Sequence, residues 1–358
     1  MQEVALNWQA ADVAVDVSIE EGLPAEIDRV AEAADPRQGF LRRAWFAAGA
    51  GGRTASTLIA RRADGRPILA LPLMSVGPHG VGLGSVPGCY WPFRSVPLAA
   101  DIAEDEIAAI LSDANARRFL GRAWRLGPVM GDDPAANLLQ GGAARAGWTI
   151  LARPAGTAYV LDIAAERASG PWPRPSTVRN NHKHEKRLAR LGALSFTYVE
   201  GAGWTKAVFD DLAAIERNSW VATRAGADPK FIDPRLRALW EAAVSDPDLA
   251  ARFSAGILSV GGVPACFSFG INCGDRRYSI ASSYDDRFGK HSPGSVTGYR
   301  TYELSADRGA SLLNLGSGDS GQKSSMGAVA GPALTDFLFV RSRALAVLLR
   351  PFWERKPK

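Results

Sequence analysis

The tripeptide Ser292-Pro293-Gly294 is the part of the sequence best suited to bind a charged ligand. A serine followed by a proline is typical of a helix start, where backbone N–H groups are unpaired and the helix dipole is positive. Gly294 has no side chain, so a phosphate can approach the backbone there. We therefore predict that this segment, extended to Ser295, binds the phosphates of a donor molecule. A helix start without a ligand is the alternative.

The glycine-rich segment 316–324 supplies a second candidate group, Lys323. Three glycines in it have the spacing of a dinucleotide-binding loop, but too little chain follows to complete such a fold. Gln322 separates the last glycine from Lys323, which breaks the spacing of a P-loop. A lysine in a glycine-rich loop after a strand can hold an oxyanion or a phosphate, and we predict this role for Lys323. A solvated loop lysine is the alternative.

Acidic and aromatic residues supply candidates for proton transfer and for substrate contact. The candidates for proton transfer, which the sequence does not rank, are Glu216, Asp285, Asp286 and Tyr284. We expect the base to be Asp285 or Glu216. Tyr284 and Trp220 are predicted to contact the substrate, although an aromatic residue such as Trp220 at a helix end commonly covers the core.

A basic segment lies in the middle of the chain and is expected to be helical. Arg179 and Lys183 are predicted to contact phosphates of the donor or acceptor, and a solvated helix face is the alternative. The other basic residues recur at three- and four-residue spacing: Lys186, Arg187 and Arg190.

The composition favours a folded protein that handles a small anionic ligand. The 358 residues include 42 lysines and arginines against 37 acidic residues, and 46% are hydrophobic, which excludes a disordered chain. The excess positive charge is concentrated in two segments, 179–190 and 341–358, which suggests an anionic ligand and not a general nucleic-acid coat. The three cysteines and four histidines show no metal-binding spacing, so we expect no metal site and a reducing cytoplasm.

No segment is expected to cross a membrane. The longest uncharged stretch, 67–93, is broken repeatedly by proline and glycine, and the chain does not open with a basic, then apolar, leader. A cytoplasmic location follows. The basic tail around Phe352-Trp353 leaves contact with the inner membrane surface as an alternative to a packed terminal helix.

The second half has the elements needed to position these residues. Strands are expected at 194–199, 256–260, 263–271, 277–283 and 311–315, and helices at 204–220, 234–244 and 292–309, with a further helix from Ser176 or Thr177 to Leu191. The strand, helix, strand order at 277–315 predicts a parallel pair of strands.

The first half reads as a mixture of helices and strands. Helices are expected at 36–47 and 104–114, a hairpin at 57–73 around Gly65, and strands at 123–126, 148–151 and 159–161. The segment 168–176 is rich in proline, glycine and serine. We therefore predict domains at 1–168 and 177–358, joined by a linker at 169–176.

In the order and spacing of these elements, the second half resembles the CelD-like acetyltransferase branch of the GNAT superfamily, from cellulose and exopolysaccharide loci. This branch is related to the Fem-type peptidoglycan aminoacyltransferases. The first half resembles a degenerate copy of the same fold. The motifs that carry the resemblance are Lys186-Arg187-Leu188 before Gly192, the Trp220 helix, the Gly261-Gly262 turn, the strand 278–285, Ser292-Pro293-Gly294 and the segment 312–323.

The resemblance implies an α/β fold, with an α+β mixed sheet, built from tandem GNAT-like domains. It also implies an N- or O-acyltransferase that uses acetyl-CoA or another acyl-CoA. The acceptor would be an amine or hydroxyl of a cell-envelope or exopolysaccharide precursor, a small molecule or a saccharide, that attacks the donor directly. Ser292, Pro293 and Gly294 fall where GNAT proteins hold the donor pyrophosphate. The alternatives are a Fem-like transferase that uses aminoacyl-tRNA, with 179–190 as its RNA footprint, and a non-catalytic module that binds a saccharide or a partner.

Overall fold

The chain folds into two compact units. The computed structural model describes residues 14–76, 83–88, 94–224, 227–318 and 321–354. One unit comprises Met1–Ala155 with Ala333–Lys358, and the other comprises Gly156–Pro332. Two long strands, β6 (Thr149–Asp162) and β12 (Val329–Val340), each begin in one unit and end in the other.

The first unit contains a mixed sheet with the strand order β1-β2-β3-β4-β5-β12. Its neighbours are antiparallel except for β4 and β5, which are parallel. The predicted hairpin is confirmed: β2 pairs with β3 and the turn residue Gly65 has a φ of 81°. The strands are β1 (Val15–Glu21), β2 (Ser56–Arg62), β3 (Pro67–Val76), β4 (Leu83–Ser85) and β5 (Ala123–Met130).

The helices of the first unit differ in part from those expected. The predicted helix 36–47 is a 3-10 turn, Pro36–Gln38, followed by α2, because the backbone is extended at Arg42 between them. The predicted helix 104–114 stops at Ser112, because Asp113 is extended and caps the next helix with its side chain. The helices are α1 (Glu26–Ala33), α2 (Arg43–Ala50), α3 (Glu104–Ser112), α4 (Ala114–Leu120), α5 (Pro134–Arg145) and α14 (Arg343–Trp353).

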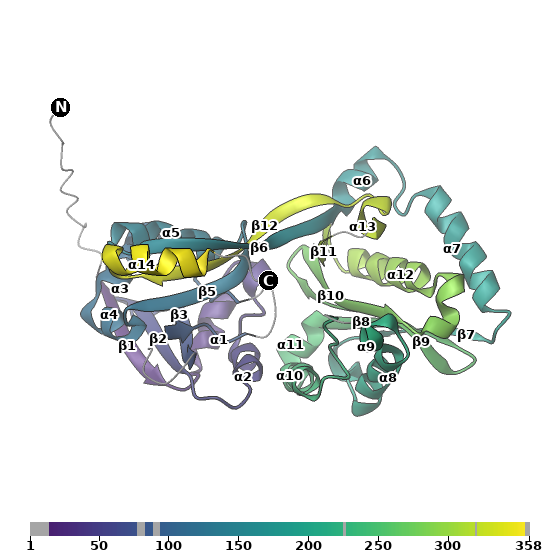
Figure 1. Ribbon diagram of the computed structural model, residues 1–358, viewed down its shortest axis with the longest axis horizontal. Helices are drawn as coiled ribbons and strands as arrows, with labels where there is room; N and C mark the ends of the chain where they lie inside the picture. The colour runs from purple at the N-terminus through teal and green to yellow at the C-terminus, as the bar shows by residue number, and fades with distance from the viewer. Residues whose placement is uncertain (1–13, 77–82, 89–93, 225–226, 319–320, 355–358) are drawn as a thin grey trace. The chain divides into compact units, whose positions relative to one another are not determined.

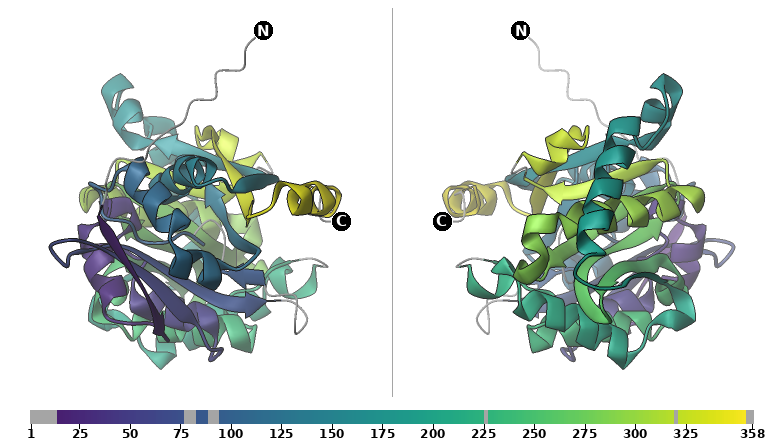
Figure 2. Two further views of the ribbon diagram at one scale, coloured as in Figure 1. Left: turned by 90° about the vertical axis from the view of Figure 1, so that its left-hand side faces the viewer. Right: turned by 90° about the vertical axis from the view of Figure 1, so that its right-hand side faces the viewer.

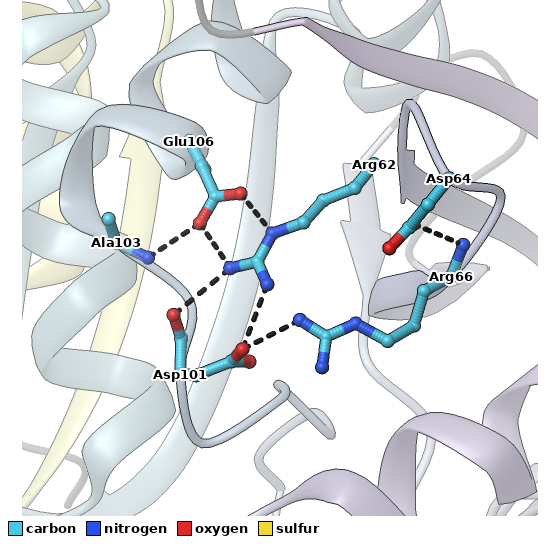
Figure 3. A network of polar contacts seen from close by, with 6 residues as sticks. All are labelled: Arg62, Asp64, Arg66, Asp101, Ala103 and Glu106. Carbon is cyan, nitrogen blue, oxygen red and sulfur yellow. Dashed lines mark hydrogen bonds and ion pairs between the residues drawn. The ribbon is translucent and has the colours of Figure 1, made fainter.

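A polar network ties the β2–β3 hairpin to the start of α3 (Figure 3). Arg62 donates from Nε and Nη2 to the two carboxylate oxygens of Glu106 at 2.5 and 2.8 Å, and from Nη1 to Asp101 at 2.8 Å. Glu106 also accepts the backbone N–H of Ala103 at 2.8 Å. These hydrogen bonds from Arg62 are the main reason why the pKa of Glu106 lies below its ordinary value.

The second unit contains a sheet with the strand order β6-β11-β10-β9-β8-β7. The predicted parallel pair is confirmed, since β10 and β11 are parallel while the other neighbouring strands are antiparallel. The segments predicted at 148–151 and 159–161 belong to one strand, β6. The remaining strands are β7 (Leu194–Val199), β8 (Phe253–Val260), β9 (Val263–Cys273), β10 (Arg276–Tyr284) and β11 (Leu312–Ser317).

Helices cover both faces of this sheet (Figures 1 and 2). Helices α7 (Pro175–Leu188) and α12 (Pro293–Asp307) lie on one face, where Leu188 and Val296 pack against β8 and β9. Aromatic residues fill the other face beneath α8 (Lys206–Arg217), α10 (Pro234–Val244) and α11 (Pro247–Arg252). Three short helices complete the unit: α6 (Ile163–Ser169), α9 (Trp220–Thr223) and α13 (Gln322–Ser325).

Two boundaries differ from the sequence expectation. Helix α7 begins at Pro175 with Arg174 as its N-cap residue and ends at Leu188, so the predicted start at Ser176 or Thr177 and the predicted end at Leu191 are both wrong. A proline is favoured at the first helical position, and it moves the helix start earlier. The predicted linker 169–176 lies within the second unit, where it covers the last residue of α6, the connection 170–174 and the first two residues of α7.

The C-terminal segment Ala333–Lys358 belongs to the first unit. Strand β12 pairs there with β5, and α14 packs on Ala123 and Leu151. These contacts join parts of the chain far apart in sequence.

Candidate active site

The strands β10 and β11 separate part of the way along the sheet. They pair over three residues, Arg276–Tyr278 with Leu312–Asn314. Beyond that point β10 continues beside β9 as far as Tyr284, and β11 continues beside β6 as far as Ser317. Within the described chain, the edge of β10 that faces β11 has no strand partner from Ser279 onward, which leaves backbone groups available to a ligand.

A cavity of about 570 Å³ lies in the second unit. It is lined by α7, by β9 and the free end of β10, by the start of α12 and by α13. This volume falls in the range of sites that hold small molecules.

The first turn of α12, which the sequence suggests as an anion site, faces this cavity. Ser292 is the N-cap residue with a φ of 54°, and its side chain makes no capping hydrogen bond. The first N–H groups of the helix are therefore not satisfied by a side-chain cap. Ser292, Gly294 and Ser295 line the cavity, while Pro293 is buried at the first helical position.

Gly294 leaves room beside the backbone at this helix start. A Cβ at this position would have its nearest neighbour, a ring carbon of Tyr284, at 3.7 Å, which is an ordinary contact. The adjacent Ser295 hydroxyl lies 2.7 Å from the Asn181 side-chain oxygen of α7 and fixes the two helices relative to each other.

Helix α7 presents an uncharged polar stripe to the cavity. Thr177, Asn180, Asn181 and His184 line it at intervals of three and four residues, so they share one face of the helix. The sequence analysis missed this stripe, although its helical spacing could have revealed it. The predicted contacts Arg179 and Lys183 are exposed on other faces and do not line the cavity.

His184 is the titratable side chain of this stripe. Its Nδ1 atom is buried and has no hydrogen-bond partner among the described residues. Burial, together with the charge of nearby Arg187, lowers the pKa of His184 below 6.5. The imidazole is therefore mainly neutral at pH 7 and able to accept a proton.

Hydroxyl and aromatic groups complete the lining. The Ser268 and Ser283 hydroxyls are buried, and neither has a partner in the described part of the chain. Trp220 and Tyr284 line the cavity, where the sequence analysis expected substrate contacts. Tyr299 and Tyr302 of α12 were not foreseen, and burial raises the pKa of Tyr299.

The two predicted carboxylates lie away from the cavity lining. Glu216 accepts the backbone N–H groups of Lys230, Phe231 and Ile232 at 2.7–3.1 Å and organises the loop before α10. Asp285 accepts hydrogen bonds from the backbone and guanidinium of Arg287. Burial raises the pKa of Asp285, but these bonds and the Arg287 charge outweigh it and hold the pKa below its ordinary value.

The Lys323 ammonium is also held by hydrogen bonds within the protein. Its ammonium donates to the carbonyl oxygens of Gly316, Ser317 and Gly318 at 2.9, 3.0 and 2.6 Å. It does not line the cavity, whereas its helical neighbours Gln322 and Ser325 do. Lys323 thus fastens the end of β11 to α13.

Two classes of feature are absent from the described ranges. No group of three or more histidine, cysteine or acidic side chains is placed to hold a metal ion there. No helix among the same residues has both the length and the apolar character required to span a bilayer.

Comparison with known families identifies the region that forms the cavity. Residues 175–324 match the family model described as an acetyltransferase (GNAT) domain. This range begins with α7 and ends in α13, so it holds nearly all of the lining. A comparison with curated protein sequences finds no match.

Solved structures share the fold of the whole chain at low sequence identity. FemX is 12% identical, with a TM-score of 0.62, over 91% of this chain and 98% of that one. A protein of unknown function from Bacteroides thetaiotaomicron is 13% identical, with a TM-score of 0.53, over 90% and 99%. The C-terminal domain of a protein described as a lysylphosphatidylglycerol synthetase from Agrobacterium fabrum is 14% identical, with a TM-score of 0.50, over 90% and 93%. The predicted mixed α/β, GNAT-like fold is confirmed.

Proposed function

We propose that this protein is an acyltransferase that moves an acyl group from acyl-CoA to an amine or hydroxyl of a cell-envelope or exopolysaccharide precursor. The observation that carries the proposal is the cavity lined by the free end of β10 and the uncapped first turn of α12. The match of residues 175–324 to the acetyltransferase model supports the same reaction class. We also propose that the protein belongs to the CelD-like branch of these acetyltransferases.

The donor would bind with its phosphates at the start of α12. The N–H groups around Gly294 and the positive end of the helix dipole favour a pyrophosphate there. The unpaired edge of β10 would then hydrogen-bond the extended arm of the donor and place its thioester within the cavity. No metal is required for this arrangement.

His184 would take the proton from the acceptor. The nucleophilic nitrogen or oxygen of the acceptor attacks the thioester carbonyl, the carbon–sulfur bond breaks, and the thiolate leaves and is protonated. A neutral imidazole that lines the cavity can accept the acceptor proton during this attack. Asp285, Glu216 and Lys323 remain predictions as catalytic residues; their contacts support positioning roles, in the 285–287 turn, the loop before α10 and the end of β11.

The lining favours a polar, uncharged acceptor such as a saccharide. Asn180 and Asn181 present amide groups, and the Ser268 and Ser283 hydroxyls are buried without partners in the described chain. Buried groups of this kind gain most when a ligand supplies the missing hydrogen bonds. The aromatic rings of Trp220 and Tyr284 add apolar surface on which a sugar ring can pack.

Release of free thiol from acetyl-CoA tests this proposal. The assay would offer amino sugars, hydroxyl sugars and simple amines as acceptors. Acceptor-dependent thiol release that His184→Ala reduces would support the proposal. The absence of thiol release with every acyl-CoA and acceptor would contradict it and favour a non-catalytic saccharide-binding or partner-binding module.

An aminoacyl-tRNA donor is the second candidate, because the outward side of α7 is basic. Four basic side chains of α7, and Arg190 just after its end, make no ion pair with a carboxylate in the part of the chain that the structure describes: Arg179, Lys183, Lys186 and Arg187. Contacts with RNA phosphates would make binding fall steeply with salt. A tRNA complex that salt weakens and Lys186→Gln with Arg187→Gln abolishes would favour this donor over acyl-CoA.

A further inference from the structure

Helix α14 is apolar on nearly all of its surface. Its inner side, formed by Leu345, Ala346, Leu349 and Trp353, packs in the first unit. Its outer side carries Val347, Leu348 and Phe352, whose exposed fractions are 69, 68 and 71%. These are the three most exposed large hydrophobic side chains among the residues described, and they lie within six positions of one helix. A helix that is apolar on both sides is normally covered on both sides.

The outer apolar side chains form one continuous face. At about 100° per residue, Val347, Pro351, Leu348 and Phe352 follow one another around the helix. The inner side chains occupy the adjoining arc of the helix. This face therefore lies beside the packed face and does not belong to the core of the unit.

Arginines border this face. Arg343 and Arg350 share the remaining arc of the helix and are exposed. Arg343 makes no ion pair with any described residue, and Arg350 reaches Glu354 only at 3.8 Å. From Arg341 to the C-terminus the sequence has six basic residues and a single acidic one, Glu354.

We propose that α14 binds the surface of an anionic phospholipid bilayer. Val347, Leu348 and Phe352 would enter the boundary between headgroups and acyl chains, and Arg343 and Arg350 would meet the lipid phosphates. A symmetric contact between two copies of this face would bring the same arginines together without opposing carboxylates, so the charge pattern favours lipid over a second copy. This inference does not depend on the proposed acyl transfer.

Vesicle sedimentation tests the proposal directly. The full chain would be mixed with vesicles of phosphatidylcholine alone or of phosphatidylcholine and phosphatidylglycerol in equal parts. We expect binding to the anionic vesicles only, weakened by salt, and reduced at least about tenfold both by Leu348→Ser with Phe352→Ser and by Arg343→Gln with Arg350→Gln.

Matched controls separate this surface from general stickiness. Leu191→Ser and Val329→Ser remove side chains that are 51 and 62% exposed elsewhere, and they should leave vesicle binding unchanged. Thiol release in solution and the thermal melting point should be preserved in all these variants, because each side chain is exposed. Failure of the wild-type chain to bind anionic vesicles would overturn the proposal. So would a dimer, seen by analytical ultracentrifugation, that Leu348→Ser with Phe352→Ser dissociates without any effect on vesicle binding.

Discussion

At the residue scale, two histidines that lie two positions apart on α7 have different surroundings. His184 lines the cavity with a buried Nδ1, whereas His182 is exposed and lies 3.3 Å from Glu185. The difference follows from helix geometry, since residues two apart point in different directions. The proposed proton transfer therefore involves His184, and His182 serves as the control.

We predict that His184→Ala lowers the rate of acyl transfer by about 10²-fold or more, because the proton acceptor is lost. His182→Ala is the matched control and should leave the rate nearly unchanged. Because burial and the Arg187 charge lower the pKa of His184 from its ordinary value, the wild-type kcat/KM should fall on the acidic side as the imidazole becomes protonated, at a lower pH than for an unperturbed histidine. A His184→Ala enzyme that keeps wild-type activity and the same acidic limb would assign the proton to another group.

Predictions for single residues were reliable where they depended only on neighbouring residues in the sequence. Ser292-Pro293-Gly294 starts a helix, as its local residue types predict, and this helix start faces the cavity. The roles of Asp285 and Glu216 could not be judged from the sequence, because their pairing depends on folded neighbours. Glu216, for example, binds N–H groups fourteen to sixteen residues further along the chain.

At the element scale, the separation of β10 from β11 creates the site. The sequence correctly predicted both strands and their parallel pairing, but nothing in it indicated where the pairing ends. That point is set by a register shift between Ser279 and Ala281 and by the different partners of the two strands beyond it. Strand pairing of this kind is a long-range property.

We predict that Glu106→Gln destabilises the first unit by about 1–3 kcal/mol, because Arg62 loses its partly buried carboxylate partner. The folded-state pKa of Glu106 is lowered, so its stabilisation is present above its ordinary pKa and is lost as the pH falls through the lowered value. Urea unfolding of wild type and variant at several pH values measures this difference.

Asp101→Asn provides the comparison within the same network. The Asp101 side chain is 56% exposed, so its loss should cost well under about 1 kcal/mol. An Asp101→Asn variant as unstable as Glu106→Gln, or a Glu106→Gln variant as stable as wild type at neutral pH, would contradict the assignment of the stabilising contact to Glu106.

At the scale of the whole molecule, the chain returns to its first unit after completing the second. The predicted boundary near 169–176 rested on composition, whereas the compact units are defined by pairing across distant parts of the sequence. Strand β12 pairs with β5 in the first unit, and Asp336 of β12 binds both Arg125 and Arg153 there. Composition carries no signal for such contacts.

We predict that Asp336→Ala destabilises the first unit by about 3–5 kcal/mol, because it leaves two arginines without their buried carboxylate. Glu354→Gln is the control, since that carboxylate is 45% exposed and meets Arg350 only at 3.8 Å. Thermal and urea unfolding measure both effects. Equal stability of the two variants would show that the Asp336 network does not anchor the returning segment.

Calorimetric titration with acetyl-CoA tests whether the start of α12 binds the phosphates of the donor. Wild type should bind most tightly, and Gly294→Asn more weakly because its side chain fills the space beside the backbone. Gly294→Asp should bind at least about tenfold more weakly again than Gly294→Asn, a loss of about 1.4 kcal/mol, because its carboxylate repels the donor phosphates. An acidic residue in the first turn favours the helix itself, so weaker binding would not reflect unfolding. Equal binding of acetyl-CoA by all three proteins, or no binding by the wild type, would contradict a donor site at the start of α12.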